Sequence, residues 1–152
     1  MELQRDSRHE HRAAAGLAFG SALVALIAVG QTWLQITVGG IQGPGSSQTG
    51  WDGRDGWTVA VAAAFAMIAA GGLLIGRRDV WLRITLFVAG ATTLVIAIVN
   101  LAGVRSKAND IHVLYGVATS EVKAKVGIGL VLIAFASVGI IAGALISQRI
   151  EK

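Results

Sequence analysis

Four long apolar segments contain no Lys, Arg, Asp, Glu or His, and this feature constrains the fold more than any other. An α-helix rises about 1.5 Å per residue, so a segment of about 20 residues crosses the ~30 Å hydrocarbon layer of a bilayer. The sequence therefore predicts an all-α membrane protein, a bundle of four transmembrane helices. The expected spans are residues 13–34, 57–75, 84–104 and 126–146.

The rest of the 152-residue chain is too short for a separate soluble domain. We therefore expect a single transmembrane domain that covers residues 1–152. Two longer loops remain between the spans, at about residues 35–56 and 105–125. Both fall on the same side of the membrane, opposite the termini.

The first loop predicts a small β-hairpin. Residues 34–38 alternate apolar and polar side chains, a cluster of Gly, Pro and Ser follows at 43–47, and residues 48–51 can form a returning strand. In the second loop, residues 111–115 predict a third strand, and the fourth helix is expected to begin near Ser120. The bundle should thus carry a small extracytoplasmic cap of hairpin and loop.

The distribution of basic residues predicts the orientation. Of the 13 Lys and Arg residues, eight lie on the side of the termini and five on the opposite side. The positive-inside rule then predicts a multi-pass protein of the plasma (inner) membrane with cytoplasmic N- and C-termini. The segment 77–83 carries most weight, because it holds three arginines and short loops follow the rule best.

The sequence lacks recognisable catalytic chemistry. The spans have none of the ionisable groups that ion-coupled transporters, proton pumps and voltage sensors keep at membrane depth. His9-Glu10-His11 lacks the spacing that places two imidazoles on one helix face, and no serine stands in a recognisable triad. We expect no enzyme, no catalytic residue, no cofactor and no metal. The net charge of +4 is attributed to residues flanking the spans, so no nucleic-acid partner is expected.

Small residues at four-residue spacing occur in every span and allow helix backbones to approach closely in lipid. Packing within the chain explains most of these stripes, and the alternative is that one stripe docks on another membrane protein. We expect the last span to be the docking face. The candidate partner-packing residues are Gly139, Gly143, Ser147, Gly72 and Gly76.

Polar residues near the outer side form two further candidate groups. Gln31 and Asn100 fall at similar depth, where their amides could hydrogen-bond to each other or contact a lipid headgroup or a partner. The outer-loop candidates are Trp51, Asp52 and Asp55. We expect the two carboxylates to cap a turn and a helix; calcium binding is the less favoured alternative, because the ligand spacing of an EF-hand is absent.

Aromatic and basic residues are expected at the membrane boundaries. Trp33 and Trp57 should lie at the outer interface and Trp81 at the inner one, where amphipathic rings settle at headgroup level. Lys123 and Lys125 should lie just above the outer headgroups. They are either solvated flanking charges or contacts for anionic lipid or an acidic partner surface.

Three stretches resemble a loose group of small actinobacterial four-span membrane proteins that includes the tryptophan-associated transmembrane type. They are residues 30–34 (GQTWL), 50–57 (GWDGRDGW) and 126–130 (VGIGL). The layout is also similar to claudin-like bundles, although the chain lacks the cysteine pair that staples the claudin loop, which puts a barrier-forming role in doubt. The resemblance implies an envelope protein with no catalytic residue to carry over. Some members look like accessory subunits of large assemblies such as Mce-type lipid importers or respiratory complexes.

Together these features predict a non-enzymatic accessory or scaffold subunit of a larger inner-membrane complex, with an envelope lipid transporter as the favoured host. The alternative is a self-associating four-span protein, such as a pore or membrane organiser. Polar residues within the spans are too sparse to form a clear water-filled route. The expected partners are other integral membrane proteins and membrane lipids.

Overall fold

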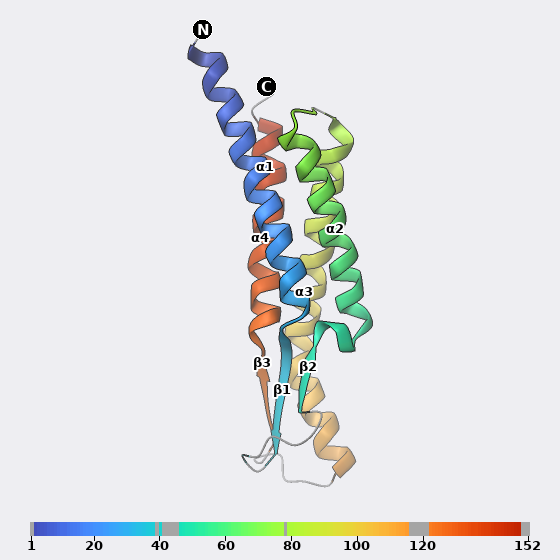
Figure 1. Ribbon diagram of the computed structural model, residues 1–152. Helices are drawn as coiled ribbons and strands as arrows, with labels where there is room; N and C mark the ends of the chain where they lie inside the picture. Colours follow the sequence, from blue (N-terminus) through green and yellow to red (C-terminus); the bar gives the residue numbers. More distant parts are fainter. Residues whose placement is uncertain (1, 39, 41–45, 78, 116–121, 150–152) are drawn as a thin grey trace.

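Within the part of the chain that the structure describes, four helices, one short 3-10 turn and three strands form the architecture (Figure 1). The computed structural model describes residues 2–38, 40, 46–77, 79–115 and 122–149. In chain order, the elements are α1 (Glu2–Val29), β1 (Thr32–Val38), β2 (Ser47–Thr49), η1 (Gly50–Asp52), α2 (Arg54–Leu74), α3 (Val80–Tyr115), β3 (Val122–Val126) and α4 (Ile128–Arg149).

All four described helices are long and apolar enough to cross a membrane, as expected for a multi-pass membrane protein. The predicted four-helix bundle is thus confirmed. The segments that meet this criterion are His9–Val29, Arg54–Leu74, Val80–Val104 and Ile128–Gln148.

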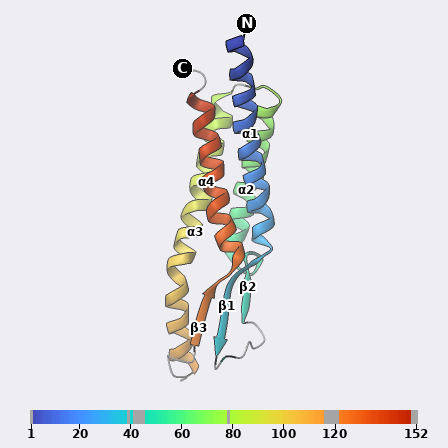
Figure 2. The ribbon, with the colours of Figure 1, turned by 90° about the vertical axis from the view of Figure 1, so that its left-hand side faces the viewer.

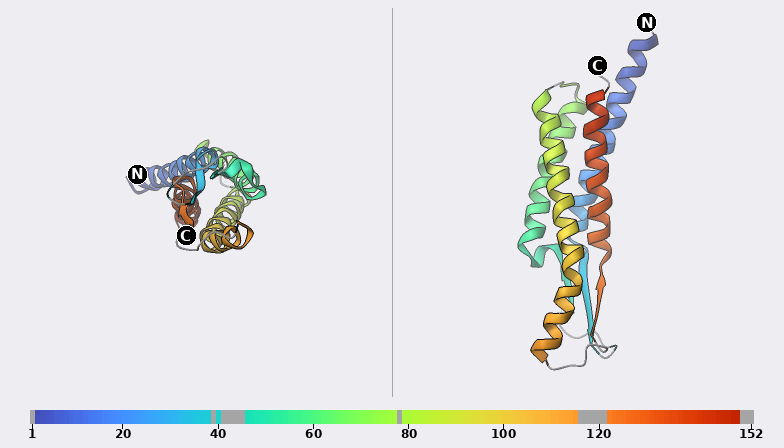
Figure 3. Two further views of the ribbon diagram at one scale, coloured as in Figure 1. Left: turned by 90° about the horizontal axis from the view of Figure 1, so that it is seen from below. Right: turned by 180° about the vertical axis from the view of Figure 1, so that it is seen from behind.

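The helices form a closed ring in which α1 packs on α2 and α4, and α3 packs on the same two neighbours (Figure 3). The beginning of α1 and the end of α4 lie at one end of the ring, on the same side as the end of α2 and the beginning of α3, and the sheet lies at the opposite end (Figure 1). We call these the terminal end and the sheet end. α1 projects beyond the other helices at the terminal end, and α3 projects at the sheet end, where it runs alongside β3 (Figure 2).

The bundle core is built largely from alanine, which lets the helix backbones approach closely. The buried alanines of α1 recur every three or four residues and therefore share one face. These are Ala14, Ala15, Ala18, Ala22, Ala25 and Ala28. Leu86 and Ile140 fill the remaining space near the terminal end, and Leu130 and Ile133 fill it near the sheet end.

The sheet is antiparallel, with β1 between β2 and β3. The hairpin formed by β1 and β2 was predicted, and its register pairs Thr32 with Thr49. On its other side β1 pairs with β3 over five residues, from Leu34 opposite Val126 to Val38 opposite Val122. The sheet therefore joins the end of α1 to the start of α4.

The third strand lies in a different place from the one predicted. Residues 111–115 continue α3, since the run after Gly103 contains no glycine or proline that would end a helix. The strand is Val122–Val126, in which the side chains of Lys123 and Lys125 are exposed and Ala124 is half-buried. The expectation that the fourth helix begins near Ser120 is consequently wrong, because α4 begins only at Ile128.

The first helix also ends earlier than the predicted span of residues 13–34. The backbone N–H groups of Gly30 and Gln31 bond to carbonyls three residues earlier, at 3.1 and 3.2 Å, which tightens and closes the last turn. Trp33 and Leu34 therefore belong to β1 rather than to the helix.

Candidate functional site

A cavity of about 300 Å³ opens at the terminal end and receives residues from all four helices or the turn between them. We call it the basic pocket, since three arginines and a histidine line it. Its lining residues are His11, Arg12, Leu73, Leu74, Gly76, Arg77, Arg83 and Ser147.

The turn after α2 shapes one wall of this pocket. Gly76 has a φ of +94°, a conformation that L side chains rarely adopt. Its N–H bonds to the Leu73 carbonyl at 3.0 Å, and the N–H of Arg77 bonds to the Gly72 carbonyl at 3.1 Å. This pair of bonds is a Schellman motif, so Gly76 serves to end α2 and to place Arg77 at the pocket.

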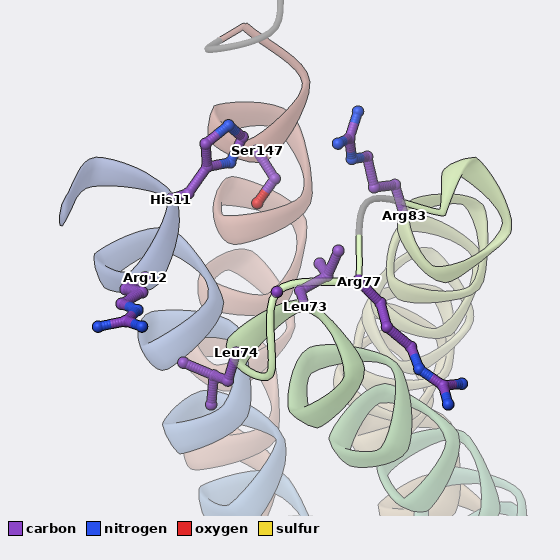
Figure 4. Close-up of a pocket in the computed structure, with 8 residues that line it drawn as sticks. His11, Arg12, Leu73, Leu74, Arg77, Arg83 and Ser147 are labelled. Atoms are coloured by element: carbon purple, nitrogen blue, oxygen red, sulfur yellow. The ribbon is translucent and has the colours of Figure 1, made fainter. Parts of the chain in front are cut away.

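The side chains that line the pocket differ in how they are directed (Figure 4). The His11 ring lies beside Ser147 on one side, and Arg83 extends along the opposite side. Arg12 and Arg77 are exposed and point away from the centre. The basic pocket thus has an inner group of three polar side chains and an outer rim of two arginines.

Arg83 is the most enclosed cation in the site, with 7% of its surface exposed. It belongs to the first turn of α3. Ser147 is also buried, and its hydroxyl donates to the Gly143 carbonyl at 2.7 Å, so its oxygen still has a lone pair with which to accept. Among the described residues that line the basic pocket, none is acidic. The nearby carboxylates of Glu10 and Asp79 are exposed.

A smaller cavity of about 130 Å³ lies at the sheet end and includes the outer-loop candidates Asp52 and Asp55. Asn100 donates from Nδ2 to Oδ2 of Asp55 at 2.9 Å and to the Ile96 carbonyl at 3.0 Å. This corrects the expected pairing of Asn100 with Gln31, whose side chain is exposed. Asp55 in the first turn of α2 and Asn100, more than five turns into the α3 span, lie beside one another on neighbouring helices, which the sequence spacing alone does not reveal.

Asp52 closes the turn between β2 and α2. Its Oδ2 accepts the backbone N–H of Thr49 at 2.6 Å and the Thr49 hydroxyl at 2.9 Å. The backbone bond first, and then the hydroxyl bond, stabilise the carboxylate and lower the pKa of Asp52 below its ordinary value of 3.8. The capping role was the favoured prediction for this residue. Among the described residues, no group of three or more His, Cys, Asp or Glu is placed to hold a metal ion.

Replacing Asp52 with Asn should loosen the β2–α2 turn. We expect faster hydrogen exchange at the Thr49 amide, because a neutral carboxamide is a weaker acceptor than a carboxylate. A lowered pKa in the folded state also means that the carboxylate stabilises the fold above pH 3.8. That contribution is lost as the pH falls through the folded-state value. After correction for the intrinsic pH dependence of exchange, the Thr49 amide of the wild type should therefore exchange faster at low pH. The same amide in the variant should show a smaller increase. Asp79→Asn, at the other end of the molecule, is the control.

The tryptophans occupy three kinds of environment. Trp33, expected at the outer interface, is instead buried, and its Nε1 donates to the Ala28 carbonyl at 3.0 Å. Trp57 and Trp51 are exposed at the sheet end, with ring centroids 4.9 Å apart in an edge-to-face arrangement. Trp81 is exposed near the terminal end. Exposed indoles at both ends are typical of the two boundaries of a bilayer.

The glycine stripe of the last helix is used within the chain. A side chain at Gly139 would overlap Ser21, and one at Gly143 would lie 2.8 Å from both the Ala14 carbonyl oxygen and the Ala18 Cβ. The structure therefore corrects the choice of docking face, because α1 covers this stripe together with the buried Ser147.

The other small-residue candidates have different surroundings. A Cβ at Gly72 would meet Leu82 of α3 at 2.9 Å, so this residue too serves contacts within the chain. Gly76 is required by the turn described above. At Gly16 and Gly20 of α1, by contrast, an added Cβ would meet no atom within 4 Å, so their stripe faces outward.

No protein-family model, no curated protein and no solved structure matches this chain. The function is therefore inferred from the geometry of the bundle and of the cavities described above.

The basic pocket was not predicted as a site. Its arginines were used only to assign the orientation, because a cluster of basic residues between two spans is expected in any protein that follows the positive-inside rule. The enclosure of Arg83 depends on how α4, which packs beside α3, and α1, which lies across the ring from it, are placed around the side chain. In the sequence, Arg83 directly precedes the predicted span of residues 84–104, and this position does not show that its side chain is enclosed.

Proposed function

We propose that this protein is a non-catalytic accessory subunit of a larger inner-membrane complex, with both termini in the cytoplasm. The proposal rests on a bundle interior that is packed with apolar side chains, together with a stripe of small residues on α1, Gly16 and Gly20, that no other described part of the chain covers. The host that we favour is an envelope lipid transporter, on the resemblance described above. The excess of Lys and Arg at the terminal end supports the orientation.

The interior of the bundle supports a scaffold rather than a pore. The buried hydroxyl of Ser137 has one proton and two acceptors within hydrogen-bond distance, the Ile133 carbonyl at 2.7 Å and the Thr93 hydroxyl at 2.9 Å. The single proton of the Thr93 hydroxyl in turn lies within reach of two carbonyls of its own helix, those of Ala89 and Gly90. These hydroxyls are satisfied within the chain, and alanine and branched apolar side chains surround them. A water-filled route would need polar groups that remain available to water along the whole span.

The outward stripe of α1 supports association within the membrane. Lipid gives little hydrophobic drive for helix association, so close backbone packing at small residues must supply it. Gly16 and Gly20 lie four residues apart on an exposed face of α1, with open space in front of both. A transmembrane helix of another integral membrane protein can approach this face closely. A second copy of the chain would be the partner in the self-association alternative.

The double substitution of Gly16 and Gly20 with Leu should reduce recovery of the partner about tenfold. This loss corresponds to about 1.4 kcal/mol, within the range for close helix packing in membranes. The measurement is affinity purification from mild-detergent extracts of native membranes, followed by mass spectrometry. Ala64→Leu, which enlarges an exposed small residue of α2, is the matched control and should leave recovery unchanged.

The identity of the recovered proteins separates the alternatives. Large unrelated membrane subunits support the accessory role, whereas recovery of only the same chain supports self-association. A lone monomer would contradict both. Equal recovery with wild type and the double variant would show that α1 is not the contact face.

A further inference from the structure

We propose that the lipid-facing surface of the bundle fits a bilayer whose hydrocarbon layer is about 27 Å thick, which is thinner than the ~30 Å of an average bilayer. The lipid that suits this surface is phospholipid with short acyl chains, and the protein should thin a thicker bilayer around itself. This inference is independent of the accessory role, since it concerns the surrounding lipid rather than a protein partner. It is the same whichever side of the membrane the terminal end faces.

Exposed apolar side chains show how long the lipid-facing surface is. On three of the described helices, the first and the last large apolar residues that are exposed stand about 18 residues apart, which corresponds to about 27 Å along a helix axis. On α1, whose exposed face also contains Gly16 and Gly20, they cover a shorter length. The three pairs are Trp57 of α2 and Ile75, which follows α2, then Val80 and Val99 of α3, and Ile128 and Ile146 of α4. Three helices therefore give the same length independently.

Charged and polar side chains limit this surface at the terminal end. Arg77 and Asp79 are exposed between Ile75 and the start of α3. Arg12 is exposed on the part of α1 that lies at the terminal end, and Gln148 is exposed near the end of α4. A charged side chain is costly inside a hydrocarbon layer, so the apolar part of the bilayer must stop at the level of these residues.

A contact between two helices sets the limit at the sheet end. Asp55 is exposed in the first turn of α2, and Asn100 of α3 donates a hydrogen bond to it at 2.9 Å. Because a carboxylate is costly within hydrocarbon, Asp55 must lie at the level of the headgroups. The hydrogen bond places Asn100 at the same level.

α3 therefore crosses the membrane with only part of its apolar segment. The segment Val80–Val104 has 25 residues, or about 37 Å of helix, and its last residues come after Asn100. From there α3 continues alongside β3 to Tyr115, beyond the other helices (Figure 2). Length and hydropathy alone would place residues 101–104 inside the hydrocarbon layer, whereas the contact with Asp55 places them outside it.

The exposed indoles agree with both limits. Trp51 and Trp57 contact each other edge-to-face at the sheet end, next to Asp55 in the sequence. Trp81 is exposed in the first turn of α3, near the terminal end. Indoles settle at headgroup level, so the two groups of tryptophans mark the same two levels as the polar residues.

The resulting apolar layer is too short for an average bilayer. A helix tilt of about 20° would shorten it further, to about 25 Å, so a hydrocarbon layer of ~30 Å exceeds it by about 3–5 Å. Tilting cannot correct this mismatch, because tilt reduces the length that the helices span. The bilayer must therefore become thinner around the protein or supply shorter acyl chains.

The first test measures stability against bilayer thickness. The purified full-length chain is placed in nanodiscs of phosphatidylcholines with acyl chains of increasing length, and the hydrocarbon thickness of each lipid is measured by X-ray scattering. We expect the thermal midpoint to be highest at about 27 Å and to fall by about 3 °C or more at about 33 Å. Asn100→Leu removes the polar limit on α3 and should shift the optimum toward thicker bilayers, whereas Gln48→Leu, at an exposed position of β2, should leave it unchanged. A wild-type midpoint that is highest at about 30 Å or above would overturn the proposal.

The second test locates the limit on α3 directly and does not depend on stability. The chain has no cysteine, so a spin label can be attached at a single introduced one. Val95→Cys and Ala102→Cys are suitable, because both positions are exposed. In bilayers with a hydrocarbon layer of about 30 Å, we expect molecular oxygen to reach mainly the label at Val95 and a water-soluble nickel complex to reach mainly the label at Ala102. If oxygen instead reaches mainly the label at Ala102, α3 crosses with the whole of Val80–Val104 and the proposal is wrong. A partner recovered by affinity purification would survive that result.

Discussion

Replacing Trp33 with Ala should lower the free energy of unfolding by about 3–5 kcal/mol, the usual cost of removing a buried aromatic side chain. Trp33 is 7% exposed although it belongs to a strand at the edge of the bundle. Its ring lies so close to Gly50 and Gly129 that a Cβ at either glycine would come within 2.8 Å of it. One side chain therefore fixes β1, η1 and the start of α4 against each other.

The hydrogen bond from Trp33 to the Ala28 carbonyl adds a second, smaller effect. Trp33→Phe keeps most of the ring but removes the donor, so we expect a loss of about 1–3 kcal/mol. Trp57→Ala is the matched control, because Trp57 is 61% exposed, and it should change stability by less than about 1 kcal/mol. Thermal midpoints of the detergent-solubilised proteins should follow the same order. Similar midpoints for Trp33→Ala and Trp57→Ala would show that Trp33 is not a structural centre.

Gly127→Ala should be strongly destabilising, with an expected cost of about 3 kcal/mol or more. An added Cβ would overlap the carbonyl oxygen of Thr32, a backbone atom that cannot move without breaking β1. The Gly127 N–H also donates to the Trp33 carbonyl at 2.8 Å, so the ladder continues up to the residue before α4. No rotamer change can relieve a contact between two backbone segments.

Gly103→Ala provides a control with the opposite sign. Gly103 is a helical residue of α3, and a Cβ added there would meet no atom within 4 Å. Alanine there should raise helix stability by up to about 1 kcal/mol, since glycine loses more conformational freedom on folding. Thermal midpoints and limited proteolysis of the sheet end would measure both variants. Gly127→Ala with a wild-type midpoint would mean that β3 and α4 can shift apart at no cost.

The four helices could be predicted from the sequence because a membrane-spanning helix needs about 20 residues and few or no charged side chains. Each of the four segments meets both conditions without reference to the others. The hairpin could also be predicted, since its alternation and its Gly-Pro-Gly turn are local signals. The third strand could not, because Val122–Val126 is too short to predict alone and is ordered by pairing with β1. Residues 111–115 were predicted as the third strand but belong to α3. A short run of apolar residues is compatible with the periodicity of a strand and with that of a helix.

The candidate sites were harder to predict than the fold. A small-residue stripe has the same sequence pattern whether it faces another helix of the chain, as Gly143 does, or open space, as Gly16 does. Likewise, Asn100 lies near the end of the apolar span Val80–Val104 although α3 continues to Tyr115, and its partner Asp55 follows from which helices are neighbours in the ring. Both distinctions depend on the order of helices around the bundle, which a single sequence does not specify.

The sheet gives the molecule a mechanical property. Only Gly30 and Gln31 separate α1 from β1, and Gly127 alone separates β3 from α4, so two adjoining membrane helices continue into neighbouring strands of one ladder. These connections are too short to absorb a tilt or an axial displacement of α1 within the bilayer. Such a movement must shear that ladder or move α4 and the sheet together with α1.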